Sequence, residues 1–307
     1  MRILSLFDGI SCGMVALECA GIQVERYVAY EIDKYAIKIS QKNHHKIEHC
    51  GNVFDGDFTQ YQGFDLLIGG SPCTYWSIAK AHRETTSDGE GFRLFMQYVR
   101  ALQESKCKYF LYENNYSIHK NINHEITKKL GVEPIMINSA LVSAQQRKRC
   151  YWTNIPNITQ PKDKGILLKN VLERGVAWQG KSYCLNARYN GAYLKNTLER
   201  HQRTMIAEPV RIGDIGSNSQ GHRVYSVHGK SVTLSANGGG QGGATGLYKI
   251  DLPDGDYIIR KLSPVECERL QTLPDNYTER VSNTQRYKQL GNGWTVDVIA
   301  HILRNIK

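Results

Sequence analysis

Two side chains capable of covalent chemistry each follow a short apolar run that predicts a buried strand. Cys73 follows the run 66–68 through a Gly-Gly-Ser-Pro turn, and Glu113 comes directly after the run 109–112. In open α/β sheets ligands bind beyond the carboxyl ends of the strands, so both side chains should face one crevice. An accessible thiolate can attack a substrate, and a carboxyl group can move a proton. The pair predicts nucleophilic catalysis with acid assistance, although a cysteine after proline is by itself more often inert.

Two arginines belong to an extended segment at 145–149, which reads Gln-Gln-Arg-Lys-Arg. Because side chains alternate along an extended backbone, Arg147 and Arg149 should point to the same side. Their guanidinium groups would stabilise negative charge that develops on a substrate near Cys73. Taken by itself, the segment is more typical of an exposed basic strand.

A glycine-containing turn joins the first predicted strand to a helix. Phe7, Asp8 and Gly9 open the turn, and Gly13 follows in a Gly-x-x-x-Gly spacing. Dinucleotide sites need Gly-x-Gly-x-x-Gly, so this spacing disfavours a nicotinamide dehydrogenase. Glu31 ends the second predicted strand, where its carboxylate can accept both hydroxyls of a ribose, and Asp8 could hold an ammonium group. A ribose, an amino-acid tail and no phosphate describe S-adenosylmethionine; a purely structural glycine turn is the alternative.

The first 155 residues alternate strand-like and helical patterns. This alternation predicts a parallel sheet with helices on both faces, that is, a doubly wound, Rossmann-like α/β domain. The predicted strands are 3–6, 27–30, 66–68 and 109–112, and the predicted helices lie near 13–19, 34–41 and 92–102.

Beyond these residues the pattern becomes irregular and basic. Residues 156–250 hold 13 basic and five acidic side chains, which accounts for most of the net charge of +10. The charge indicates a polyanionic partner such as nucleic acid, with a solvated basic surface as the alternative. Strand-like pieces at 224–227 and 247–250 flank a glycine-rich stretch at 236–246. We therefore expect a smaller, irregular, β-rich domain.

The end of the chain returns to helical patterns. Ser263 has the chemistry of an N-cap, with Pro264 at the first helical position and Glu266 in the first turn. The apolar run 295–303 should pack back against the first domain. We expect a catalytic domain at 1–155 and 285–307, a second domain at 156–255 and a bridging segment at 256–284.

Composition excludes several classes of protein. No apolar run in the 307 residues reaches the roughly 18–20 residues of a membrane helix, and the first residues do not form a secretory signal. The eight cysteines are scattered without zinc-type spacing, so we expect reduced thiols and no metal site. These features favour a cytoplasmic protein, and we expect a monomer without a membrane partner.

Taken together, the motifs occur in the order and spacing of the C5-cytosine DNA methyltransferase family of bacteria and bacteriophages, which the sequence resembles over nearly its whole length. One such motif would be weak, whereas seven in the family's order are specific. The matching residues are Phe7, Asp8, Gly9 and Gly13, Glu31, Pro72, Cys73 and Ser77, Glu113 and Asn114, Gln145, Arg147 and Arg149, Arg260, Ser263, Pro264 and Glu266, and Gln289, Gly291, Asn292 and Gly293.

The resemblance implies methylation of cytosine at C5 in double-stranded DNA, with S-adenosylmethionine as cofactor and S-adenosylhomocysteine as product. Cys73 would add to C6 of a cytosine flipped out of the duplex, and Glu113 would donate to N3. Arg147 or Arg149 would stabilise O2. Residues 156–255 would form the target-recognition domain, which holds phosphates and reads the flanking bases.

The resemblance also assigns binding residues. The implied cofactor-binding residues are Phe7, Asp8, Gly9, Ile10, Gly13, Glu31, Ile32, Asn52, Val53, Asn292, Gly293 and Trp294. The implied DNA-contacting residues are Ser77, Gln145, Arg188, Lys195 and Thr233.

The sequence departs from the family pattern at three positions. Asn115 replaces a common valine, Asn52 stands where an aspartate often contacts the adenine, and Trp76 is a bulky residue inside the active-site loop. The amide oxygen of Asn52 can still accept a hydrogen bond from an exocyclic amine.

Two further alternatives remain beside the dehydrogenase. RNA cytosine methylation by a member of the same family is one, and Ser77 together with the sizeable recognition region favours DNA over it. A non-catalytic DNA-binding module is the other, and such a module has no use for Cys73 together with Glu113. A restriction endonuclease with the same target sequence is a further partner to consider.

Overall fold

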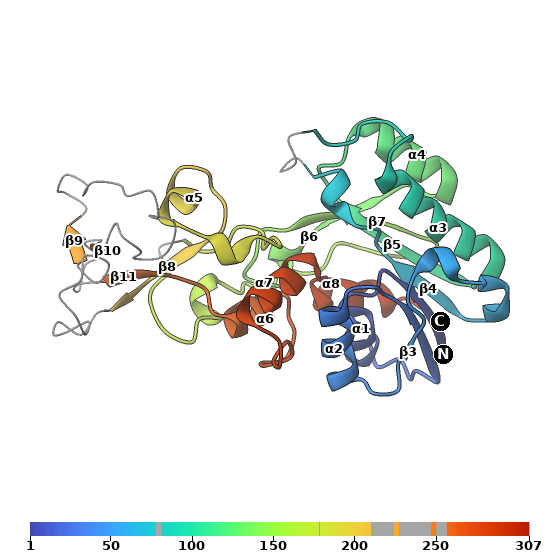
Figure 1. The fold of residues 1–307 in the computed structure, drawn as a ribbon, viewed down its shortest axis with the longest axis horizontal. Helices are drawn as coiled ribbons and strands as arrows, with labels where there is room; N and C mark the ends of the chain where they lie inside the picture. Colours follow the sequence, from blue (N-terminus) through green and yellow to red (C-terminus); the bar gives the residue numbers. More distant parts are fainter. Residues whose placement is uncertain (78–81, 178, 210–223, 227–246, 250–256, 307) are drawn as a thin grey trace.

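The computed structural model describes residues 1–77, 82–177, 179–209, 224–226, 247–249 and 257–306. Thr233 and the glycine-rich stretch 236–246, on which predictions were made, lie outside these ranges. The molecule is elongated, with a large sheet at one end and the paired strands β8 and β11 reaching toward the other; both chain termini lie close together beside the sheet (Figure 1).

A seven-stranded sheet forms the centre of the large lobe, in the order β3-β2-β1-β4-β5-β7-β6. Strands β1 to β5 are parallel, as predicted, but β7 runs antiparallel to both of its neighbours. The expectation of a parallel sheet is therefore wrong at this edge. The short segment between β6 and β7 contains no crossover helix that would carry the chain back to start a parallel strand, so β7 pairs antiparallel with β6. The strands are β1 (Arg2–Leu6), β2 (Arg26–Tyr30), β3 (Glu48–His49), β4 (Leu66–Gly69), β5 (Tyr109–Asn115), β6 (Ile135–Asn138) and β7 (Lys148–Thr153).

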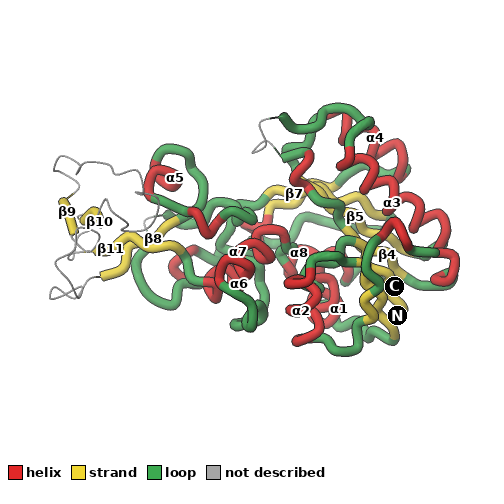
Figure 2. The backbone as a smooth tube through the Cα atoms, viewed as in Figure 1, coloured by secondary structure: helices red, strands yellow, loops and turns green. Residues whose placement is uncertain are grey.

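Helices cover both faces of this sheet, which confirms the doubly wound architecture (Figures 1 and 2). Neighbouring residues of one strand belong to different cores: Ile3 packs into the core on one face, and Leu4 into the core on the other. This follows from the period of two along a strand, since a sheet buried on both faces needs apolar side chains at successive positions. The first face carries α1 (Cys12–Cys19), α2 (Lys34–Asn43) and α8 (Val296–Leu303), and the second carries α3 (Glu90–Ser105) and α4 (Lys120–Leu130).

The strand β5 is longer than its apolar run predicts. It continues through Asn115, so that Glu113 lies inside the strand, opposite Tyr151 of β7, instead of just beyond its end. The polar end of β5 is buried and pairs with β7, and this pairing could not be anticipated from β5 alone. The short strands β3 and β6 and the helix α4 were not predicted either.

The second lobe contains short, irregular elements. Strand β8 pairs antiparallel with β11, and β9 pairs parallel with β10. Leu168, Leu185 and Tyr189 are buried in the same core as α8, so the region after residue 156 packs partly onto the large lobe. The elements are α5 (Leu194–Leu198), β8 (Met205–Pro209), β9 (Val224–Ser226), β10 (Leu247–Lys249) and β11 (Tyr257–Lys261).

Two helices connect the lobes, α6 (Pro264–Leu270) and α7 (Asn283–Asn292). The predicted start of α6 is confirmed, because Ser263 and Glu266 form a reciprocal capping box in front of Pro264. Between the two helices, the hydroxyl of Tyr277 donates to the carbonyl oxygen of Ile10 at 2.7 Å. The C-terminal region thereby holds the turn that follows β1. Within the described ranges, no helix is long and apolar enough to cross a lipid bilayer.

Candidate active site

One cavity of about 490 Å³ lies where β1, β2, β4 and β5 end and brings most of the predicted site residues together. Gly13, Ser77, Gln145, Arg188 and Lys195 are not among the residues that line it. The predicted residues that do line it are Phe7, Asp8, Gly9, Ile10, Glu31, Ile32, Asn52, Val53, Cys73, Glu113, Arg147, Arg149, Asn292, Gly293 and Trp294.

The turn after β1 is held in an unusual backbone conformation. Phe7, Gly9 and Ser11 have φ values of 57°, 60° and 60°, a region that is strained for side chains other than glycine. The carboxylate of Asp8 supports the turn by accepting from the hydroxyls of Ser11, Ser5 and Tyr27. These contacts occupy most of the lone pairs of Asp8, which limits what it can offer to an ammonium group.

Glu31 lies at the rim of the cavity with its carboxylate fixed by backbone amides. Gly9 donates to Oε2 at 2.8 Å, and the amides of Ile32 and Asp33 donate to Oε1 at 2.8 and 2.7 Å. Burial raises the pKa of Glu31, and the three amides oppose this by stabilising the ionised form. Beside it, the side chain of Ile32 is 74% exposed, which places an apolar surface next to a fixed acceptor.

The far end of the same cavity holds the acid expected to act on the substrate. Arg149 Nε lies 2.9 Å from Oε1 of Glu113, and Trp294 Nε1 donates to Oε2 at 2.9 Å. Both members of the ion pair are almost buried, with side chains 12% and 11% exposed. Burial opposes the charge of Arg149, but Cys184, Glu113 and Cys73 together raise its pKa. Arg149 therefore remains a cation between Glu113 and the two thiols.

Arg147 also lines the cavity, but its guanidinium is held by backbone groups. It donates to the carbonyl oxygens of Leu185, Gly291 and Gly293 at 2.9, 3.2 and 2.8 Å. These bonds join the end of α7 to the second lobe and use most of the donors of a side chain that is 4% exposed. Of the two arginines, Arg149 is therefore the one whose guanidinium contacts the expected acid Glu113.

Cys73 begins a short 3₁₀ turn, Cys73–Tyr75, directly after Pro72 and β4. It is partly exposed and lines the cavity, as a nucleophile must. Burial instead raises the pKa of Cys12 to about 12 and that of Cys150 to about 11, which makes these thiols unreactive. Cys184 is the exception. Burial raises the pKa of its thiol, but Arg147 and Arg149 lower that pKa by more, so that it lies below the usual value for cysteine.

The bulky Trp76 anchors the loop that carries Cys73. Its side chain is fully buried, and its Nε1 donates to Oε2 of Glu84 at 3.1 Å. The same carboxylate accepts from the amide of Gly91 in the first turn of α3. Ser77 donates its backbone N–H to the carbonyl oxygen of Cys73 at 2.9 Å. Trp76 thus ties the nucleophile loop to α3.

Two of the predicted binding residues have structural roles. Gln145 is fully buried; its amide donates to the carbonyl oxygen of Leu270 at 3.2 Å, and its oxygen accepts from Leu185 N at 2.7 Å. It is therefore not placed to contact DNA. A Cβ atom on Gly13 would lie 2.4 Å from Ile68 Cδ1, so this glycine allows α1 to pack closely on the sheet, and it is not among the residues that line the cavity.

The exposed basic residues of the second lobe remain available to a partner. Arg188 is exposed, and Lys195 contacts only Glu199, at 3.4 Å, among the ion pairs of the described residues. Such an exposed pair holds its partners weakly. Thr233 lies outside the described residues.

Some cavity residues were missed from the sequence. Tyr30 and Phe54 add aromatic surface near Ile32 in the lining, and Lys288 and Gln289 come from α7. Both α7 side chains donate to Oδ2 of Asp33, at 2.8 and 3.0 Å. Gln289 belongs to the last family motif, at 289–293, so that motif was the feature of the sequence that could have indicated its contact with Asp33.

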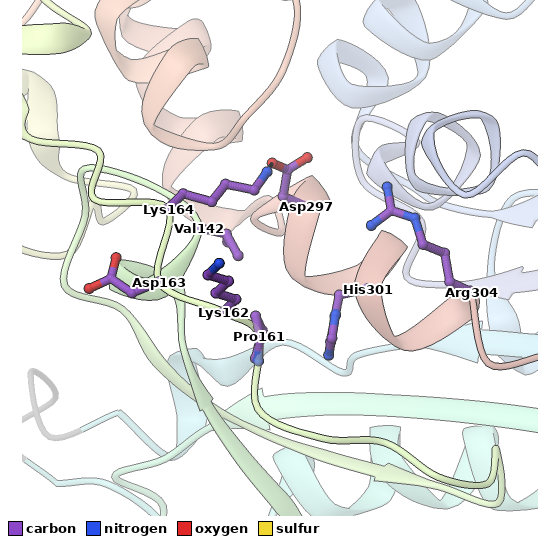
Figure 3. A pocket seen from close by; sticks show the side chains of 8 residues that line it. All are labelled: Val142, Pro161, Lys162, Asp163, Lys164, Asp297, His301 and Arg304. Carbon is purple, nitrogen blue, oxygen red and sulfur yellow. Dashed lines mark hydrogen bonds and ion pairs between the residues drawn. The ribbon is translucent and has the colours of Figure 1, made fainter.

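A second cavity of about 460 Å³ lies between the segment 161–164 and α8 (Figure 3). It contains none of the predicted catalytic residues. Lys164 is paired with Asp297, His301 contacts the carbonyl oxygen of Thr159, and Arg304 donates to that of Cys19. Because Cys73 and Glu113 both line the first cavity, the first cavity is the candidate active site.

Comparison with known proteins agrees with this geometry. The C-5 cytosine-specific DNA methylase family matches residues 1–307, and the chain belongs to that family. It is thus an enzyme of the C5-cytosine methyltransferase class. It is 30% identical to the type II methyltransferase M.HhaI of Haemophilus parahaemolyticus, over 100% of this chain and 94% of that protein. It is 25% identical to the orphan methyltransferase M.SPRI of Bacillus phage SPR, over 100% and 97% of the two chains.

Solved structures show the same fold. The methyltransferase EhMeth of Entamoeba histolytica superposes with a TM-score of 0.64 at 16% identity, covering 99% of this chain and 97% of the other. A DNA modification methyltransferase encoded in an E. coli prophage gives 0.60 at 18% identity, covering 99% and 98%. The predicted family and fold are confirmed.

Proposed function

We propose that this protein transfers a methyl group from S-adenosylmethionine to C5 of a flipped-out cytosine in double-stranded DNA, through a covalent bond between Cys73 and C6. The observation that carries the proposal is the convergence of Cys73, Glu113 and Arg149 on the same cavity as Glu31 and Ile32. A thiol, a carboxyl group and a fixed cation thus adjoin a site suited to a nucleoside.

The cofactor half of the cavity fits an adenosyl group. Glu31 offers its remaining lone pair on Oε2 to ribose hydroxyls, Ile32 offers an apolar face to adenine, and Asn52 offers polar atoms at its edge. When bound, S-adenosylmethionine supplies a methyl group that a carbon nucleophile can accept. The protein's own task is to make C5 of cytosine such a nucleophile.

The residues at the other end of the cavity perform that task. The thiolate of Cys73 adds to C6, and the electron pair of the C5–C6 double bond becomes available at C5. Glu113 donates a proton toward N3 as charge develops on the ring, while Arg149 stabilises O2. Once C5 carries its methyl group, the C5 proton passes to solvent, the C5–C6 double bond re-forms and the Cys73 thiolate leaves C6. N3 returns its proton to Glu113, and 5-methylcytosine is released.

The target base has to leave the helix before this chemistry can begin. C5 and C6 are buried in the base stack of a duplex, so the cytosine must rotate out into the cavity. The basic second lobe, including Arg188 and Lys195, would bind the phosphates on either side. Methylation of duplex DNA and of RNA by the purified protein, followed by bisulfite sequencing, tests the proposal; methylation of RNA alone would contradict it.

Replacing Glu31 with alanine should weaken binding of S-adenosylhomocysteine by about 1–3 kcal/mol, because ribose hydroxyls lose their acceptor. Calorimetry measures the change. Three backbone amides lose their acceptor as well, so the melting temperature must be recorded beside it. Unchanged affinity in a protein that melts normally would remove Glu31 from the cofactor site.

Replacing Arg188 and Lys195 together with alanine should reduce the salt dependence of DNA binding. Each phosphate contact adds roughly −0.9 to the slope of log K against log salt, so the double variant should lose nearly two units. Lys129→Ala on α4, exposed on the opposite lobe, is the matched control and should keep the slope. An equal slope in the wild type and the double variant would place the DNA elsewhere.

A further inference from the structure

Trp294 connects helix α1 to the candidate acid Glu113. It follows Gly293, just before α8, and its Nε1 donates to Oε2 of Glu113 at 2.9 Å. The other edge of the same ring lies against α1, since a Cβ atom on Gly13 would be 3.6 Å from Trp294 Cζ3. One side chain therefore spans from the helix after the β1 turn to the carboxylate inside β5.

The contacts of Glu113 fix where its proton can reside. Oε1 faces the guanidinium of Arg149 and Oε2 faces the indole of Trp294, each at 2.9 Å. Both partners are donors only and cannot accept a proton from the carboxyl group. A proton on Glu113 must therefore occupy a lone pair that neither partner uses, and Glu113 lines the cavity.

The corner around Oε2 is also sterically closed. A Cβ atom built on Gly70 would lie 3.1 Å from Oε2 and 2.8 Å from the carbonyl oxygen of Glu113. Any larger residue at this position would therefore press against Glu113. With Gly70 on one side and the indole on another, the carboxylate has little freedom to rotate. The hydrogen bond from the indole N–H therefore fixes which side of the Glu113 carboxyl group faces a cytosine bound in the cavity.

We propose that Trp294 is a positioning residue for the methylation step: its indole N–H orients Glu113 and directs the proton of that carboxyl group toward N3 of the flipped cytosine. The inference rests on the proposed function, because it assumes that Glu113 donates a proton to a flipped cytosine. Trp294 then affects the reaction of that cytosine and not only the binding of the cofactor. It predicts that Trp294 acts through Glu113.

Trp294→Phe keeps an aromatic ring and removes the N–H donor. At saturating cofactor and DNA, kcat should fall roughly 10- to 100-fold, the effect of losing a hydrogen bond to a charged group. Affinity for S-adenosylhomocysteine by calorimetry should change by less than about threefold.

A double-mutant cycle tests whether the effect passes through Glu113. In a Glu113→Ala background no carboxylate remains to be oriented, so adding Trp294→Phe should reduce the rate by less than about twofold. Trp152→Phe is the matched control: it removes another indole N–H, which donates to Thr127 Oγ1 at 3.0 Å and not to Glu113, and it should leave kcat at saturation close to that of the wild type. If Trp294→Phe does not fold, 3-benzothienylalanine at position 294 removes the donor at nearly constant size.

The outcomes separate the inference from the proposed function. A wild-type protein that fails to methylate DNA overturns both. If the wild type methylates DNA but Trp294→Phe has the wild-type kcat at saturation, the inference fails and the function stands. A loss of S-adenosylhomocysteine affinity with normal kcat at saturation, or a full additional loss in the Glu113→Ala background, would likewise show that Trp294 does not act through Glu113.

Discussion

Replacing Cys73 with serine should abolish methylation of duplex DNA while cofactor and DNA binding persist. A serine hydroxyl is a far weaker nucleophile than a thiolate, and the loss should be at least the roughly 10²–10⁴-fold of a missing acid–base group. The cavity gains no space and loses no charge, so the melting temperature should stay close to that of the wild type. Tritium transfer from labelled S-adenosylmethionine to mixed-sequence DNA measures the rate.

Cys19→Ser is the matched control for this substitution. Cys19 is also exposed, but it lies at the end of α1, is not among the residues that line the cavity, and burial raises the pKa of its thiol. Its replacement should leave the rate unchanged. Methylation at the wild-type rate by Cys73→Ser would refute covalent catalysis by this residue.

The second large effect is expected at Glu113. Glu113→Gln should slow methylation by about 10²–10⁴-fold, because the amide cannot donate a proton to N3 as an acid does. The structure adds a further cost: Arg149 and Trp294 both donate, whereas a glutamine has only one acceptor oxygen. One donor then faces an NH₂ group, so we also expect a loss of roughly 1–3 kcal/mol in unfolding free energy.

Calorimetry and denaturant unfolding distinguish these effects from a cofactor defect. Affinity for S-adenosylhomocysteine should be retained in Glu113→Gln, since Glu31 and Ile32 are untouched. A variant with normal turnover would exclude Glu113 as the acid. Reduced cofactor affinity with a normal rate at saturation would move Glu113 into the cofactor site instead.

The strands and helices of the sheet were predictable because their pattern is local. Successive apolar residues such as Ile3 and Leu4 predict a strand buried on both faces, and the structure has β1 at Arg2–Leu6. The capping residues Ser263 and Glu266 likewise act within one turn of helix. The order of the motifs was sufficient to identify the family. It was also sufficient to predict that Cys73, Glu113 and Glu31 line one cavity, as they do.

The contacts that sequence analysis could not predict depend on partners far away in the chain. Arg147 and Arg149 are alike in sequence, yet only Arg147 meets the backbone carbonyls of Leu185 and Gly293. Gln145 is buried because Leu270 and Leu185 close over it. No local pattern reveals such contacts. Every residue has a backbone carbonyl oxygen, so the sequence does not mark which one a distant arginine or glutamine will contact. The same holds for the bond from Trp294 to Glu113.

Antiparallel pairing at the edge of the sheet was missed for a related reason. Strands β6 and β7 join through a short segment whose helical part is only the 3₁₀ turn Ser139–Leu141, and β7 pairs with the polar end of β5. The residues of β5 at this end, Glu113, Asn114 and Asn115, are buried although they are polar. Polar residues inside a strand weaken the pattern on which strand prediction relies.

Trapping on 5-fluorocytosine tests covalent catalysis by Cys73 most directly. Duplex DNA in which 5-fluorocytosine replaces cytosine throughout contains every possible target, and a methylated ring with fluorine at C5 has no proton to lose. The wild-type protein, with S-adenosylmethionine, should remain attached to this DNA through boiling in detergent, and peptide mapping should place the link at Cys73. Cys73→Ser should form no adduct. A link at Cys184, whose pKa the neighbouring arginines lower, or methylation of ordinary DNA without any adduct on the fluorinated duplex, would contradict the mechanism.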